Sequence, residues 1–173
     1  MALIYAGGLG VSDFVDNYTN SGYSPHQYLY GAPVVIPSSG TVTQLGFWGG
    51  ASGSGSFGFK LGLYNSSGTL IGQSTASITA GAAAAWIDSG AVSLPVSAGT
   101  YYLMVSCQTS SGFLGSSNTG NGTYATEDYA TAMQASESLS IGAETGRLFG
   151  VRLDFTAGGG GTNNQRGTTL GAG

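Results

Sequence analysis

The chain has 173 residues and a formal net charge of −4, and charged side chains make up only 7% of it. A typical soluble domain carries about 25% charged residues, so the polar surface here must consist mainly of Ser, Thr, Asn, Gln and glycine backbone. The 4 Lys and Arg residues provide no basic patch for nucleic acid or for an anionic membrane surface. We therefore expect neither of these partners.

The first 31 residues are rich in Gly, Tyr and Asn. We expect residues 1–31 to form an N-terminal arm or edge strands. The first clear strand pattern after them covers residues 41–48, where large apolar side chains recur. The alternation changes phase between Val42 and Leu45, which predicts a β-bulge near Gln44.

The clearest alternation of the chain covers residues 57–64. Side chains that alternate with a period of two mark a strand with one buried face. The side chains expected on that face are Phe57, Phe59, Leu61 and Leu63. Asn65, Ser66, Ser67 and Gly68 then form a turn sequence before the apolar residues 69–71, which predicts a hairpin in which Gly68 supplies a positive φ.

Two further strands are expected near the C-terminal half. Residues 101–107 alternate so that Cys107, the single cysteine, lies on an apolar face as a small buried side chain. Residues 149–155 alternate in the same way, and this phase places Arg152 and Asp154 toward water.

Helix signals are weak. Residues 125–138 could contain one or two helical turns capped by Thr126. Residues 80–86 contain helix-favouring alanines, but Gly81 and its neighbours fit a loop or an edge strand equally well. Residues 158–173 begin with four glycines and contain almost no apolar side chains, as is typical of a flexible tail.

Strands and turns recur mostly every 8–15 residues, a spacing typical of sandwiches and jelly rolls. We therefore predict an all-β protein, an antiparallel, jelly-roll-like β-sandwich with extended N- and C-terminal arms. The sandwich domain is expected to cover residues 32–157, and the Gly-rich C-terminal tail residues 158–173.

No motif predicts catalysis or a cofactor. His26 is the only histidine, and no nucleophile-elbow pattern Gly-x-Ser-x-Gly precedes a helix. Asp13, Asp16 and Asn17 could offer oxygen ligands to Ca²⁺, but Asx turns explain the same residues and the spacing is not that of an EF-hand. We expect no catalytic, cofactor-binding or metal-binding residues.

Aromatic side chains are the candidate contact residues for a glycan or a protein partner, because flat rings complement sugar faces and are enriched at protein interfaces. The candidates are Tyr18, Tyr23, Tyr28, Tyr30, Trp48 and Trp86. For the two tryptophans the alternative is core packing, with Trp48 continuing an apolar strand and Trp86 closing one end of the sandwich.

Residues 32–107 carry the order GTVTQLGFWGG, GFKLGLYNSSGTLIGQS, AAAAWIDSGAVSLPVSAG and TYYLMVSC. This order resembles a jelly-roll-like β-sandwich module of phage virion proteins, in decoration and fibre components, and of bacterial surface proteins. The resemblance covers less than half of the chain. It implies a non-catalytic role, and no binding residue is carried over because such modules share no fixed site motif.

The N-terminus has no signal-peptide pattern, so a protein that ends outside a cell would leave by another route, and assembly into a virus particle released by lysis is one such route. The leading hypothesis is a virion structural protein of a tailed phage, a capsid decoration protein or a head- or tail-fibre component. Its expected partners are other virion proteins and further copies of itself, with trimers as one arrangement that fits. The alternative is a carbohydrate-binding module for host cell-surface glycan.

Overall fold

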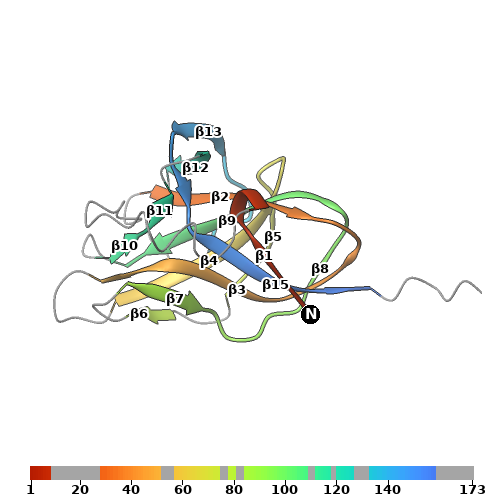
Figure 1. The fold of residues 1–173 in the computed structure, drawn as a ribbon. Coiled ribbons are helices and arrows are strands. Elements are labelled where there is room, and N and C mark those ends of the chain that lie inside the picture. Colours follow the sequence, from red (N-terminus) through yellow and green to blue (C-terminus); the bar gives the residue numbers. More distant parts are fainter. Residues whose placement is uncertain are drawn as a thin grey trace, which may run out of the picture.

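The computed structural model describes residues 1–8, 28–51, 57–74, 78–80, 84–108, 112–117, 120–126 and 133–158. In these ranges the chain forms β-strands and one short 3-10 helix, η1 (Ala6–Gly8), and no α-helix. The two main sheets are antiparallel throughout, so the predicted all-β class is confirmed. Their arrangement is consistent with a β-sandwich (Figure 1).

Sheet A has β3 at its centre, and the sheet follows the order β1-β15-β3-β10, with β7 and β8 also paired to β3. Its strands are β1 (Ala2–Tyr5), β3 (Gly40–Ala51), β7 (Ala85–Asp88), β8 (Leu94–Val96), β10 (Gly112–Leu114) and β15 (Val151–Ala157). β1 lies at the edge and pairs with β15 from Ala2↔Phe155 to Tyr5↔Arg152.

Sheet B follows the order β13-β12-β2-β9-β4-β5, and β6 pairs with β4. Its strands are β2 (Tyr28–Ile36), β4 (Phe57–Asn65), β5 (Leu70–Gln73), β6 (Ile78–Ala80), β9 (Gly99–Cys107), β12 (Asn121–Thr126) and β13 (Ser140–Thr145). A separate pair joins β11 (Ser116–Ser117) to β14 (Leu148–Phe149). Figure 1 shows β12 and β13 in the upper part of the molecule and β3 and β7 in the lower part.

The main core lies between the sheets. Phe47 of β3 and Phe59 of β4 meet there with ring centroids 4.7 Å apart, and both side chains are fully buried. Large side chains that leave water in this way contribute about 1.5–3 kcal/mol each. Cys107 is also fully buried as a free thiol, as predicted.

Four local predictions are confirmed. The β3–β15 register shifts between Asp154↔Gln44 and Phe155↔Val42, which places the predicted bulge at Thr43, next to Gln44. Both Val42 and Leu45 are fully buried on its two sides. Phe59, Leu61 and Leu63 are likewise buried, whereas the side chain of Phe57, the fourth residue predicted for that face, lies outside the described part. Gly68 has φ of 78° in the β4–β5 turn.

The helical turns expected within residues 125–138 are absent from the described part of that segment. β12 continues through Thr126, and residues 133–138 are not helical. Instead, the Leu70 N–H donates to the Ala135 carbonyl oxygen and the Glu137 N–H donates to that of Gly68. Backbone pairing with the β4–β5 turn therefore replaces helical hydrogen bonds. Of residues 80–86, the structure describes Ala80 at the end of β6 and residues 84–86, which contain the start of β7, so the described part forms strand and not helix.

A second apolar cluster lies on the outer face of sheet B, the face turned away from the main core. Tyr64, Tyr102 and Met104 are buried there together with Met133. The Tyr64 hydroxyl donates to the Gln134 carbonyl oxygen at 3.1 Å. The chain thus covers part of this face with its own residues 133–139.

Three glycine substitutions separate the cost of a positive φ from the cost of steric overlap between an added Cβ and a neighbouring atom. Only Gly68 lies in the β4–β5 turn. A Cβ on Gly68 would overlap the Glu137 carbonyl oxygen, whereas Gly146 has φ of 73° with open space around it, and Gly90 has open space without a positive φ. We expect Gly146→Ala to lower the free energy of unfolding by about 1 kcal/mol, Gly68→Ala by clearly more, and Gly90→Ala by less than about 0.5 kcal/mol. Urea unfolding measures all three, and equal effects of the first two would contradict the overlap.

Candidate functional site

The outer face of sheet A brings together aromatic and charged side chains from four strands. Alternation on β3 buries Leu45 and Phe47 toward the core, so Gly46 and Trp48 point away from it. The neighbouring strands add side chains that are in register with these two residues. We call the resulting group the sheet A cluster, which consists of Tyr5, Trp48, Trp86, Asp88 and Arg152.

Pairing across the strands explains how the cluster forms. Trp48 of β3 lies opposite Trp86 of β7, and Tyr5 of β1 lies opposite Arg152 of β15. Gly46 lies between Arg152 on one side and Asp88 on the other. A Cβ at position 46 would overlap Asp88 Oδ1, so the glycine allows the two charged side chains to meet across β3.

Arg152 and Asp88 form a two-pronged ion pair. Arg152 Nη2 donates to Asp88 Oδ2 at 2.7 Å and to Oδ1 at 2.9 Å, and Nε donates to Oδ1 at 3.1 Å. The exposed fractions of the two side chains are 16% for Arg152 and 35% for Asp88. Burial lowers the pKa of Arg152, but Asp88 and Tyr5 together raise it, and the net direction is upward. The guanidinium therefore stays charged and neutralises the carboxylate.

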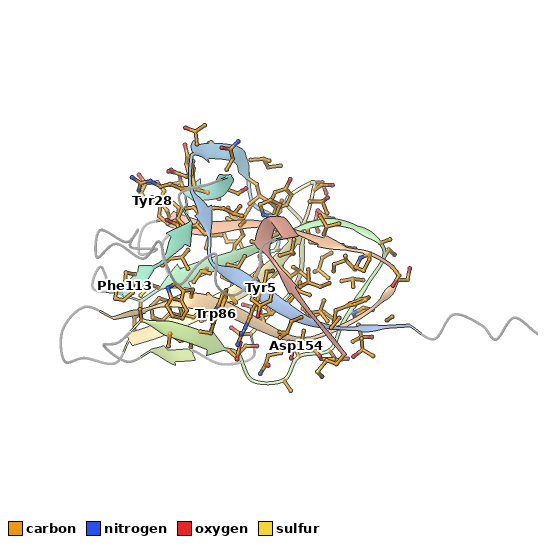
Figure 2. All side chains as sticks on the ribbon, in the orientation of Figure 1. Tyr5, Tyr28, Trp86, Phe113 and Asp154 are labelled. Atoms are coloured by element: carbon orange, nitrogen blue, oxygen red, sulfur yellow. The ribbon has the colours of Figure 1, made fainter. Side chains whose placement is uncertain are left out.

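The aromatic rings of the cluster pack at steep angles. Tyr5 and Trp86 meet edge to face, with centroids 5.5 Å apart and an angle of 72°, and Trp48 and Trp86 lie 5.8 Å apart at 59°. Arg152 Cζ lies 4.7 Å from the centroid of the Trp86 ring, a cation–π contact. Figure 2 shows Tyr5 and Trp86 next to each other. The rings thus form a packed ridge and not a flat platform.

The six aromatic residues predicted from sequence do not form one group. Tyr18 and Tyr23 lie outside the described residues. Tyr28 and Tyr30 belong to β2 in sheet B, where Tyr30 packs against Phe149 and Tyr28 lies edge to face with Tyr124. In Figure 2 the label of Tyr28 stands apart from those of Tyr5 and Trp86.

Trp48 continues β3, as the core alternative expected, but its side chain is partly buried on the outer face of sheet A. Trp86 is partly buried on the same face and also packs against residues of the main core. The indole Nε1 of Trp48 is buried and has no hydrogen-bond partner among the described residues. An unmet donor of this kind costs about 1–3 kcal/mol.

Sequence reasoning missed three members of the cluster. Tyr5 lies in an edge strand, one of the two expectations for residues 1–31, but its side chain was not predicted to be a contact residue. Asp88 was not predicted as a contact residue either, and Arg152 was expected to face water. Arg152 does point away from the core, as predicted. Its side chain contacts Asp88 and Trp86 of β7, however, where solvent was expected. The alternation of Trp86 with Asp88 was visible, but only the strand register brings them to Arg152.

Within the described ranges, no group of three or more His, Cys, Asp or Glu side chains is placed to hold a metal ion. No described helix has the length and apolar character needed to cross a lipid bilayer. His26, Asp13 and Asp16 lie outside the described residues. Comparisons with protein-family models, with curated protein sequences and with solved structures found no match.

Arg152→Lys tests the ion pair and the ring contact together. Lysine keeps the positive charge but lacks the planar fork that binds both carboxylate oxygens and stacks on an indole. We expect the free energy of unfolding to fall by about 1 kcal/mol, measured by urea unfolding at low and at high salt. Arg147→Lys, at a position outside the cluster, is the control. Equal stability of Arg152→Lys and the unchanged protein would contradict this account of the geometry.

Proposed function

We propose that the chain is a non-enzymatic structural protein of a virion, a capsid decoration protein or a head- or tail-fibre component. In this role it binds neighbouring subunits, both other virion proteins and further copies of itself. The observation that carries the proposal is the sheet A cluster, in which half-buried aromatic rings surround an ion pair that neutralises itself.

Such a surface has the composition of a protein interface. Interface centres are enriched in Trp, Tyr and Arg and depleted in free charge. The Arg152–Asp88 pair already satisfies its own charges, so a partner need not supply a counter-ion. The rings of Trp48 and Trp86 leave apolar area that a partner can bury.

The rest of the described surface also supports lasting contacts. The described ranges contain seven charged residues, namely Lys60, Asp88, Glu137, Glu144, Arg147, Arg152 and Asp154. Lys60 is buried, and Asp88 and Arg152 pair with each other. Repulsion between like charges keeps many proteins monomeric. The described surface has little unpaired charge to provide such repulsion between copies.

The cluster suits a protein partner better than a sugar. A pyranose stacks on an open, flat ring face, whereas the rings here meet at 59° and 72° and Arg152 lies over Trp86. Carbohydrate binding through the tryptophans is therefore an alternative outcome of the tests below, and a glycan array on the unchanged chain detects it.

Light scattering coupled to size exclusion tests self-association. We expect the full chain to have a mass that is a multiple of 17.3 kDa, and Trp86→Ser to weaken the oligomer at least about thirtyfold, as loss of an interface anchor does. Val35→Ser is the matched control, because Val35 is an exposed apolar residue of sheet B. Circular dichroism verifies that both variants are folded. A monomer at all concentrations, or equal weakening by both variants, would count against the cluster as the interface.

A second test addresses the virion directly. If the chain is a structural component, particles purified by density from the source phage should contain many copies of it, measured by quantitative mass spectrometry against the major capsid protein. The same preparation after mild dissociation should release the chain in its oligomeric form. Its presence in the lysate but not in purified particles would overturn the proposal.

A further inference from the structure

A polar pocket of about 440 Å³ lies beside the β4–β5 turn, on the sheet B side of the molecule. Its walls are the turn residues Ser66, Ser67 and Gly68 on one side and residues 136–139 on the other, and Ile141 of β13 closes one end. Small-molecule sites typically have volumes of about 300–1,000 Å³. The pocket is separate from the sheet A cluster.

Hydrogen bonds fix the turn that forms the first wall. The Asn65 side-chain oxygen accepts from the backbone N–H groups of Ser67 and Thr69, both at 3.0 Å, and from the Ser67 hydroxyl at 2.7 Å. Gly68 completes the turn with its positive φ. An Asx turn of this kind holds its loop without a ligand.

The second wall is attached to the first through the backbone. The Glu137 N–H donates to the Gly68 carbonyl oxygen at 2.8 Å, and Thr69 and Ser136 form an antiparallel bridge. Both walls therefore keep their positions whether or not the pocket is occupied. A preformed site loses less conformational entropy when it binds a ligand.

The lining residues define the chemistry of a ligand. Three serines, at positions 66, 136 and 138, offer hydroxyls that both donate and accept, and Glu137 offers a carboxylate. The Ser67 hydroxyl already donates to Asn65 Oδ1, so it can only accept from a ligand. The Glu137 carboxylate can accept hydrogen bonds from a ligand that brings donors. No Lys, Arg or His of the described chain lines the pocket, which disfavours an anionic ligand.

The remaining wall is aliphatic. Leu139 is partly buried, and the exposed fraction of Ile141 is 52%. A ligand that presents hydroxyls to the serines and Glu137 and a C–H face to Leu139 and Ile141 satisfies all of these groups. We propose that the pocket binds a neutral hexopyranose, either as a free sugar or as the end of a glycan.

This proposal goes beyond the proposed virion role and does not depend on it. The pocket is built by the β4–β5 turn, residues 136–139 and β13, whereas the cluster belongs to strands of sheet A. A substitution in the pocket leaves the sheet A cluster intact, and the reverse also holds. An experiment can therefore contradict sugar binding without contradicting the virion role.

Saturation-transfer NMR on the full chain tests the pocket with the methyl glycosides of glucose, galactose and mannose. We expect at least one glycoside to bind with a millimolar dissociation constant. Glu137→Gln should weaken it about tenfold or more, because hydrogen bonds to a charged group contribute about 1.5–3 kcal/mol. Glu144→Gln is the matched control, since Glu144 is a β13 carboxylate that does not line the pocket.

Two additional variants keep the result decisive. Ile141→Ser removes the aliphatic wall at an exposed position where unfolding is not expected, and it should also weaken binding. Trp86→Ser should leave it unchanged. Thermal unfolding verifies that each variant is folded, and a purified oligosaccharide with the same terminal hexose distinguishes a glycan end from a free sugar.

Three results would overturn the proposal. The first is no saturation transfer to any of the neutral glycosides. The second is loss of binding in Trp86→Ser with binding kept in Glu137→Gln and Ile141→Ser, which would place the sugar at the sheet A cluster. The third is tighter binding of N-acetylneuraminic acid than of every neutral glycoside, because the Glu137 carboxylate repels an anion.

Discussion

The inward burial of Val42, Leu45 and Phe47 on β3 is the constraint on which the other features of sheet A depend. The bulge at Thr43 allows Val42 and Leu45 to face the core although they are three positions apart. Phe47 then meets Phe59 across the gap between the sheets. A shift of β3 by one residue would turn Trp48 inward and Phe47 outward. Because β7 and β15 pair with opposite sides of β3, the same register brings Trp86, Asp88 and Arg152 together, so core packing determines the geometry of the cluster.

Alternation predicted the strands because the period of two is a property of the extended backbone itself. It was sufficient for β4, β9 and β15 and for the phase change near Gln44, and the chemistry of Asn65 and Gly68 was sufficient for the turn. The partners of each strand were not predictable. β15 lies beside β3 and β12 lies beside β2, although these strands are far apart along the chain. Nothing in a local pattern states which strands share hydrogen bonds, so no cross-strand contact of the candidate site was predictable.

Local patterns also predict the direction of a side chain but not what covers it. Arg152 points away from the core as expected, yet Asp88, 64 residues away in sequence, binds it. Lys60 alternates with Phe59 and Leu61 and so points to the outer face of sheet B, yet it is buried. For Arg152 the deciding element comes from a distant part of the chain. In this weakly charged protein, a charged residue within a strand therefore does not show that the strand has a solvent-exposed face.

The two outer faces differ in what completes them. On sheet B the chain supplies its own cover, because Met133 and Leu139 pack on Tyr64, Tyr102 and Met104. On sheet A no described segment plays this part, and partly exposed rings around the Arg152–Asp88 pair complete the surface. Burial of apolar area contributes about 25 cal/mol per Å², so any further cover of these rings would be favourable. The cover of sheet B instead leaves a polar pocket at its margin, which suits a small hydroxylated ligand.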